Sequence, residues 1–166
     1  MSRPARSRVL PLAVALIAAL GTAACSNDKD LADASGFAAG SARAGSAQDF
    51  VVNIGDRVFF ESDSTDLTPT ATATLDKQAS WLQRYPRYTF LIEGHADERG
   101  TREYNFSLGA RRAQVVNDYL ASRGIASGRM RTVSYGKERP VAVCNDISCW
   151  SQNRRAVSVL DGGAGS

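Results

Sequence analysis

Two oppositely charged residues are the part of this sequence best suited to bind a small ligand. Asp97 follows a short apolar run that ends at Glu93, and Arg112 lies 15 positions further on, in a segment whose apolar residues have helical spacing. A carboxylate and a guanidinium held near each other can bind a ligand that carries both an ammonium and a carboxylate group, such as one end of an amino acid. This chemistry is binding, and it requires no catalytic group.

Other interpretations of these residues stay open. Asp97 and Arg112 can form a salt bridge with each other that is only structural. His95 could belong to a metal or acid–base site together with Glu93 and Asp97, but one histidine and two carboxylates at this spacing do not match the usual ligands of zinc. We therefore expect His95 to be a packed, hydrogen-bonded residue beside the pocket, and we expect no metal and no cofactor.

Two helices are expected to carry or support these side chains. Thr68 followed by Pro69 is typical of a helix start, and Pro86 ends the apolar stripe that follows. A second stripe predicts a helix over 102–122, with Gly124 just after its end.

Strands are expected where β-branched and aromatic residues alternate between turn residues. They are predicted at residues 50–60, 88–93, 131–135 and 155–160, with a short turn or helix at 150–153. The resulting order is strand, helix, strand, helix, strand, strand. This order predicts an α+β fold in which a small mixed sheet carries the two main helices on one face. The domain is expected over 50–161, followed by a disordered tail over 162–166.

The first 49 residues have the composition of an export signal followed by a tether. A basic start and an apolar run predict a secretory signal over 1–24, and small residues before Cys25 are typical of bacterial lipoproteins, in which this cysteine is acylated. Thr22 departs from the usual leucine, so ordinary cleavage that leaves a free thiol stays an alternative. Ser26 favours the outer membrane over the inner one. Residues 25–49 are rich in small and polar residues, which predicts a flexible tether.

The charge balance of the exported chain is neutral. The whole sequence has 20 Lys and Arg against 17 Asp and Glu, and three of the arginines lie within 1–24. Removal of that segment leaves 17 charges of each sign. Nothing in this balance indicates a nucleic-acid-binding protein, which needs a clustered basic face.

Two further cysteines lie close together near the end of the domain. Cys144 and Cys149 are separated by four residues, and an exported chain enters an oxidising compartment. A small-loop disulfide is expected, and free thiols are the alternative.

Three motifs resemble the OmpA-like domain family, and within it the peptidoglycan-associated lipoproteins of the Tol–Pal system. They are the segments 93–105, 134–140 and 152–156, and the resemblance covers residues 56–160. It implies non-covalent binding of the peptidoglycan stem peptide, with Asp97 binding the ammonium of diaminopimelate and Arg112 its carboxylate. The remaining residues that it implies for this pocket are Asn105, Arg99, Glu61, Ser62 and Asp63, although Glu61 and Ser62 depart from the usual residues of the family at this turn.

The same resemblance implies partners and a location. The implied location is the outer membrane, with a lipid anchor and the domain facing the periplasm. The implied partners are peptidoglycan, TolB and other Tol or outer-membrane proteins. The implied role is in envelope integrity and cell division. The alternative function is a cell-wall hydrolase or amidase, which needs a nucleophile with a base, or a metal site. The chain has one histidine and no plausible cysteine nucleophile, so we expect no enzyme.

Overall fold

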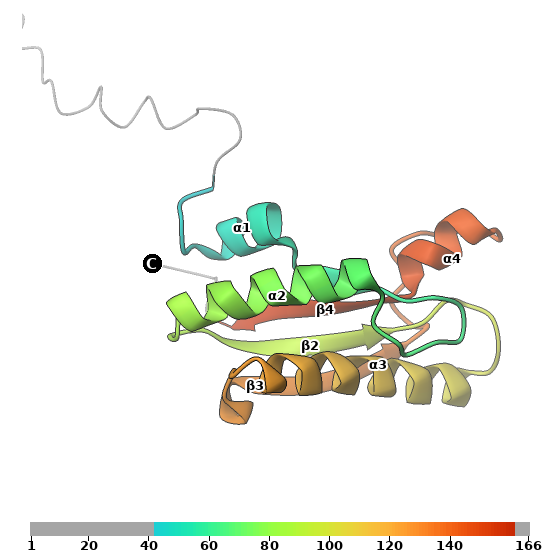
Figure 1. Cartoon of the computed structure of the whole chain (residues 1–166). Coiled ribbons are helices and arrows are strands. Elements are labelled where there is room, and N and C mark those ends of the chain that lie inside the picture. Colours follow the sequence, from blue (N-terminus) through green and yellow to red (C-terminus); the bar gives the residue numbers. More distant parts are fainter. Residues whose placement is uncertain (1–41, 162–166) are drawn as a thin grey trace, which may run out of the picture. The chain divides into compact units, whose positions relative to one another are not determined.

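A four-stranded sheet organises residues 42–161, the part of the chain that the computed structural model describes (Figure 1). The expected signal sequence, Cys25 and the tail at 162–166 lie outside the described residues. In chain order the elements are α1 (Ala47–Asp49), the π-helix η2 (Phe50–Gly55), β1 (Arg57–Phe59), α2 (Pro69–Arg84), β2 (Thr89–His95), α3 (Arg102–Ser122), the 3₁₀-helix η3 (Ser127–Arg129), β3 (Met130–Gly136), α4 (Ile147–Asn153) and β4 (Arg155–Asp161).

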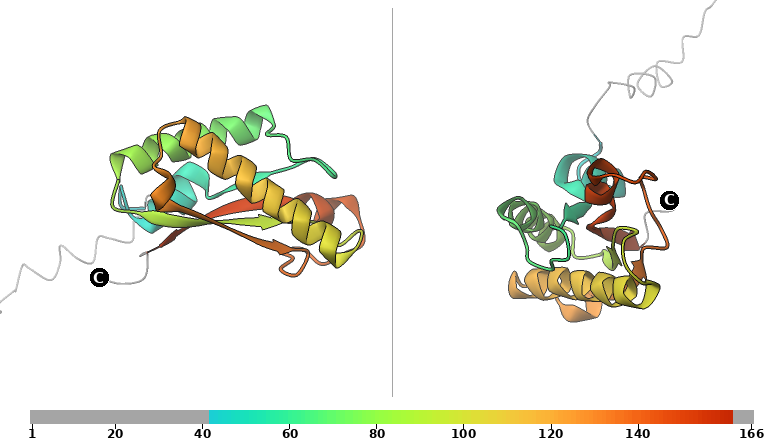
Figure 2. Two further views of the ribbon diagram at one scale, coloured as in Figure 1. Left: turned by 90° about the horizontal axis from the view of Figure 1, so that it is seen from below. Right: turned by 90° about the vertical axis from the view of Figure 1, so that its right-hand side faces the viewer.

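The sheet is mixed, with strand order β1-β4-β2-β3. β4 pairs antiparallel with both β1 and β2, whereas β2 and β3 are parallel and α3 forms the crossover between them. Both long helices lie on the same face of the sheet (Figure 2). The predicted α+β class, with two main helices on one face of a small mixed sheet, is confirmed.

Local sequence signals set the starts of the two long helices. The Thr68 side chain accepts a hydrogen bond from the Ala71 amide at the start of α2, with Pro69 as the first helical residue. The Thr101 side chain accepts in the same way from the Tyr104 amide at the start of α3. After α3, Gly124 has a φ of 87°, a left-handed conformation that costs a glycine little.

The core lies between the helices and the sheet. Alternate residues of β2, Phe90 and Ile92, point to the helices and are fully buried, as a half-covered strand requires. The helices meet them with fully or almost fully buried side chains, among them Leu75 and Leu82 from α2 and Val116 and Leu120 from α3.

Two glycines bring α3 unusually close to β2. A Cβ atom added to Gly94 would lie 1.8 Å from the backbone oxygen of Gly109, and one added to Gly109 would lie 2.8 Å from the Gly94 oxygen. Real side chains do not fit at such distances, so the helix packs on the strand backbone itself. This contact fixes the start of α3 relative to the end of β2, where the site forms.

The predicted strand over 50–60 is wrong for its first half. Residues Phe50–Gly55 are helical and only Arg57–Phe59 pair in the sheet. Phe50 is buried against Trp81 of α2, with ring centroids 5.0 Å apart, and the Gln78 side chain donates to the Gly55 oxygen. Packing against α2 therefore overrides the strand propensity of these β-branched and aromatic residues.

The folded unit also begins before the expected boundary at residue 50. The Asp49 carboxylate accepts hydrogen bonds from the Trp81 indole and from the Gly45 amide, and the Gly45 oxygen accepts one from the Tyr88 hydroxyl. The last residues of the expected tether are thus part of the packed structure. Among residues 42–161, no helix is long and apolar enough to cross a membrane.

Candidate functional site

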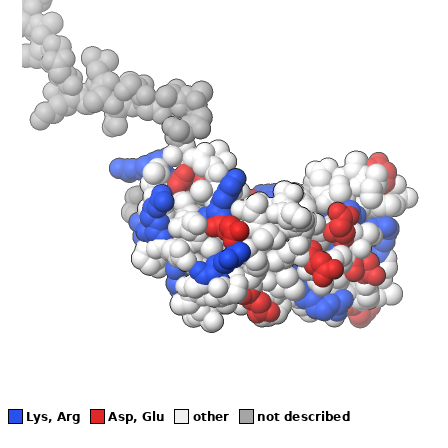
Figure 3. All heavy atoms as spheres, viewed as in Figure 1, with Lys and Arg blue, Asp and Glu red and all other residues white. Residues whose placement is uncertain are grey.

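A polar pocket lies where β2 ends and α3 begins. It measures about 240 Å³ and includes five of the seven predicted ligand-binding residues. Its lining residues are Ser62, Asp63, Asp97, Arg99, Gly100, Tyr104, Asn105 and Leu108. Acidic and basic side chains lie side by side at this right-hand end of the folded unit (Figure 3).

Asp97 supplies an almost fully buried carboxylate to this pocket. Its side chain is 9% exposed, and its two oxygens accept hydrogen bonds from the Arg99 guanidinium at 3.1 and 2.6 Å. A further contact of 3.4 Å joins it to Arg154. Burial alone would raise the pKa of Asp97, but the hydrogen bonds from Arg99 and Arg154 outweigh burial and lower the pKa below its usual value. The carboxylate is therefore charged at neutral pH.

Arg112 is not among the lining residues; it lies one turn further along α3 than Leu108, and its side chain contacts no solvent. The residue is 0% exposed, and its guanidinium donates to the backbone oxygens of Ser64, His95 and Glu61 at 2.9, 2.9 and 3.1 Å. These bonds tie the turn after β1 to the end of β2. A guanidinium has five N–H groups, so two remain after these three contacts.

Arg112 keeps its positive charge in this environment. Burial, and after it repulsion by Arg154, lowers its pKa to about 10, which is still well above neutral pH. Within residues 42–161, Asp97 forms ion pairs with Arg99 and Arg154 and not with Arg112. The interpretation of Asp97 and Arg112 as a direct structural salt bridge is therefore wrong.

Asn105, the last residue of the motif over 93–105, fixes the loop between β2 and α3. Its side chain is buried and donates to the Arg99 backbone oxygen at 2.6 Å. From the opposite side, the Lys137 ammonium donates to the backbone oxygens of Glu98 and Gly100. The loop that carries Arg99 is thus held by side chains from α3 and from the turn after β3.

Ser62 and Asp63, in the turn after β1, line the pocket, whereas Glu61 beside them does not. Ser62 accepts a hydrogen bond from Arg99 at 2.8 Å, and the Asp63 carboxylate accepts one from the Tyr104 hydroxyl across the pocket. Asp63 has a φ of 56°, a left-handed conformation that aspartate tolerates better than most residues. Glu61 contributes its backbone oxygen to Arg112, and its side chain lies on a neighbouring groove beside Phe59 and Gln152.

Arg154, the residue just before β4, also belongs to the site. It is 5% exposed, contacts Asp97, and donates to the Phe60 oxygen at 3.0 Å. Arg112 and Arg154 therefore bring two buried positive charges to one buried carboxylate. The only signal in the sequence is the pair of arginines before the last strand, and nothing in it points to Asp97.

His95 is packed as expected but is not hydrogen-bonded. It is 1% exposed and lies 5.5 Å from the Tyr135 ring, and among the residues that the structure describes neither ring nitrogen has a hydrogen-bond partner. Burial, and then the charges of Arg155, Arg139 and Arg57, lower its pKa to about 4, outweighing the Glu93 carboxylate 3.5 Å from Nε2. His95 is therefore neutral at pH 7.

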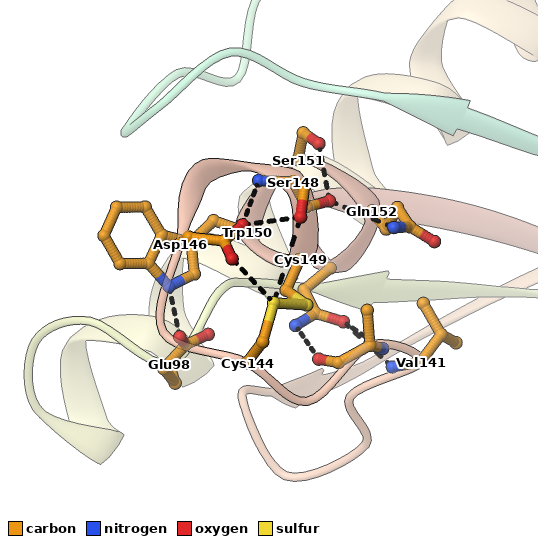
Figure 4. Close-up of a disulfide and its surroundings, with 11 residues drawn as sticks. Glu98, Val141, Cys144, Asp146, Ser148, Cys149, Trp150, Ser151 and Gln152 are labelled. Atoms are coloured by element: carbon orange, nitrogen blue, oxygen red, sulfur yellow. Dashed lines mark hydrogen bonds between the residues drawn. A yellow bond between two sulfur atoms is a disulfide. The ribbon is translucent and has the colours of Figure 1, made fainter.

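Cys144 and Cys149 form a disulfide in the structure, with their Cα atoms 5.7 Å apart (Figure 4). The bond closes the loop that leads into α4. Asp146 lies beside the two sulfur atoms, but sulfurs joined to each other are not thiolates and do not serve as metal ligands of the usual kind.

Comparison with known proteins identifies the family. The model of the OmpA family matches residues 59–155. The chain belongs to the OmpA family. A relative of this OmpA-family chain, the peptidoglycan-associated lipoprotein of Rhizobium meliloti (strain 1021), is 60% identical over 171 residues, which cover 98% of this chain and 97% of the relative. The protein of the same name from Agrobacterium fabrum is 59% identical over 159 residues, which cover 93% and 89% of the two chains.

Solved structures agree with this assignment. The crystal structure of the peptidoglycan-associated lipoprotein from Burkholderia pseudomallei aligns with a TM-score of 0.62 and 42% identity, over 64% of this chain and 90% of that one. The C-terminal domain of Helicobacter pylori MotB aligns with a TM-score of 0.61 at 22% identity, which shows a shared fold alone. The resemblance seen in the three motifs is confirmed. The relatives are named as peptidoglycan-associated lipoproteins, and this is not the name of an enzyme, in agreement with the expectation for this chain.

Proposed function

We propose that this protein is an outer-membrane lipoprotein that binds the diaminopimelate-containing stem peptide of peptidoglycan without a covalent bond. The observation that carries the proposal is the pocket in which the Asp97 carboxylate pairs with the guanidiniums of Arg99 and Arg154, while the buried charge of Arg112 acts on the same carboxylate. The end of a diaminopimelate side chain carries an ammonium and a carboxylate on one carbon. A site with charges of both signs, in which Asp97 is almost fully buried and Arg99 is partly exposed, complements that group.

The ligand's ammonium is assigned to Asp97. In the unliganded pocket the Arg99 guanidinium occupies both carboxylate oxygens, so the ammonium shares the Asp97 carboxylate with Arg99. Arg99 stays at the pocket and makes room by a small shift, because its side chain is 43% exposed, whereas Arg154 is buried. The net gain in binding free energy is therefore modest, and a single stem peptide is expected to bind weakly.

The ligand's carboxylate is assigned to Arg112. Its two remaining N–H groups are free to bind the ligand, and the charge of Asp63, which lines the pocket, acts on the Arg112 pKa. A bidentate contact suits a planar guanidinium, and lysine would serve less well. Since Arg112 has no exposed surface, the hydrogen bond between Tyr104 and Asp63 has to open as the ligand enters.

The two ends of the described part of the chain suit a tether. Gly45 and Asp161 both lie at the start of β2, where they contact Tyr88 and Thr89, and the pocket lies at the other end of that strand. Seven residues of strand separate the two by about 20 Å. A lipid on Cys25 would thus hold the domain at the membrane with the pocket directed away from its attachment. Repeated stem peptides in the wall raise the effective concentration and offset weak single-site binding.

The wider role follows from the resemblance to the Tol–Pal lipoproteins. TolB and other Tol proteins are proposed as further partners, and the protein is proposed to support envelope integrity and constriction of the outer membrane during division. The domain boundaries proposed for the chain are a signal over 1–24, a lipidated tether that starts at Cys25, and the binding domain up to residue 161.

A sedimentation assay with diaminopimelate-type peptidoglycan tests the binding function. The soluble chain from Ser26 onward is compared with its Asp97→Asn variant, which keeps the shape of the side chain and removes its charge. Asp161→Asn is the matched control, because Asp161 also pairs with an arginine but lies at the opposite end of β2. We expect the wild type and the control to sediment with the wall, and Asp97→Asn to stay in solution. Equal sedimentation of all three folded proteins would contradict the proposal.

A further inference from the structure

An aromatic side chain outside the pocket contacts both residues that follow Asp97. The Trp150 indole N–H, on α4, donates to the Glu98 carboxylate (Figure 4). The Arg99 guanidinium carbon lies 4.3 Å from the centre of the Trp150 ring. Tryptophan offers the strongest ring face for a cation, so Trp150 fixes the loop after Asp97 at two adjacent positions.

Arg99 is the residue for which this support matters most. Its guanidinium contacts Asp97 and Ser62 in the pocket, yet its side chain is 43% exposed. A long, half-exposed arginine loses considerable rotamer freedom when it is held in one position. The face of Trp150 reduces that freedom in advance, and so it keeps the guanidinium at the pocket before a ligand arrives.

Trp150 is held in turn by the disulfide. α4 has only seven residues, fewer than an isolated helix needs to be stable. The segment before it exposes most of its side chains, and Val143 is 88% exposed. Two devices fix it: the bond between Cys144 and Cys149, adjacent to Trp150, and the Asn153 side chain, which bonds to the backbone at residues 141 and 142.

We propose that Trp150 is a positioning residue for the pocket, which acts through Arg99, and that the Cys144–Cys149 disulfide makes ligand affinity depend on the redox state of the protein. The inference rests on the proposed function, because the ligand is the diaminopimelate end of a stem peptide. In the oxidised protein α4 holds Trp150 against Arg99. A thiol or phosphine reductant supplies two electrons, the S–S bond breaks, and each sulfur takes up a proton to become a thiol. In this reduced protein the loop is released, Trp150 leaves the guanidinium, and the ligand has to order Arg99 itself.

A double-mutant cycle on Trp150 and Arg99 tests whether Trp150 acts on the ligand through Arg99. Affinity for a diaminopimelate-containing stem peptide is measured by calorimetry with the soluble chain from Ser26 onward. We expect Trp150→Ala to weaken binding about two- to fivefold, the range that an exposed cation–π contact supports. Trp150→Phe keeps a ring face and is expected to restore most of the affinity. In an Arg99→Ala background, Trp150→Ala should have almost no further effect.

Nuclear magnetic resonance gives a readout that does not depend on binding strength. The Arg99 side-chain N–H signal should carry a ring-current shift in the oxidised protein, and this shift should vanish in Trp150→Ala. If the signal does not change, or if the effects of the two substitutions on affinity simply multiply, Trp150 does not act through Arg99 and the inference is overturned. If the wild type binds the peptide and Trp150→Ala binds it with equal affinity, only this inference is refuted. A wild type that does not bind refutes the proposed function.

Reduction tests the second half. Cys144 is exposed, so a phosphine reductant can reach the bond. Reduced wild type and a Cys144→Ser, Cys149→Ser double variant should both show the same two- to fivefold loss and the same lost ring-current shift. Reduction of Trp150→Ala should change its affinity no further. Unchanged affinity in the reduced wild type would overturn the redox dependence.

Discussion

Replacement of Arg112 by methionine should destabilise the domain strongly even without ligand. Methionine fills a similar volume but donates no hydrogen bond. The bond from Arg112 to the His95 oxygen is buried, and such a charge-assisted bond contributes about 1.5–3 kcal/mol. The bonds to Ser64 and Glu61 are only partly buried, so water can replace the donor, and each contributes about 0.5–1.5 kcal/mol. Together the free energy of unfolding should fall by about 4 kcal/mol.

Urea unfolding followed by tryptophan fluorescence measures this change, because Trp81 lies in the core. Arg112→Lys is the matched variant. It keeps the charge, but one ammonium cannot reach three carbonyls in different directions, so the free energy of unfolding should fall by about half as much as in Arg112→Met. A loss below about 1 kcal/mol in Arg112→Met would refute the reasoning. It would mean that the turn after β1 holds its conformation without the guanidinium.

Three further perturbations test other parts of the structure. Gly94→Ala should lower the free energy of unfolding by about 3 kcal/mol in urea titrations, because the alanine Cβ would collide with the Gly109 oxygen. An unchanged free energy of unfolding would show that α3 can move off the strand at little cost. Between pH 6.5 and about 4 the unfolded chain binds a proton at His95 that the folded chain does not. The free energy of unfolding should therefore fall by about 3 kcal/mol as the pH is lowered through this window, and His95→Gln should remove this part of the pH dependence. An unchanged profile in the variant would contradict the lowered pKa of His95. Reduction of the Cys144–Cys149 disulfide should lower the free energy of unfolding by about 2 kcal/mol, as expected for so short a loop, and with it the midpoint of thermal unfolding. A midpoint that does not respond to reductant would show that the bond adds no stability.

Much of the pocket could be predicted because its residues are close in the sequence. Asp97, Arg99 and Asn105 lie on one continuous stretch from the end of β2 to the first turn of α3. The signals for these elements are local: alternating apolar residues for the strand, and Thr101 as the cap of the helix. A chain that forms both elements has to bring the three side chains to the same place.

The parts that could not be predicted depend on contacts between distant residues. Arg154 reaches Asp97 across 57 positions, and the carbonyl partners of Arg112 lie 17, 48 and 51 positions away. A carbonyl group has no residue type, so no sequence pattern identifies such an acceptor. The π-helix over Phe50–Gly55 was missed for the same reason, because its conformation is set by Trp81 and Gln78 of α2 and not by its own residues.

The most direct test of the central claim compares two ligands that differ in one carboxylate. The soluble chain from Ser26 onward is titrated by calorimetry with a stem peptide that contains diaminopimelate, and with the same peptide in which lysine replaces it. Both ligands offer Asp97 an ammonium, but only diaminopimelate offers a carboxylate to Arg112. The proposed pocket predicts at least about tenfold tighter binding of the diaminopimelate peptide, as expected for a charge-assisted contact. Equal affinity for the two peptides would contradict it.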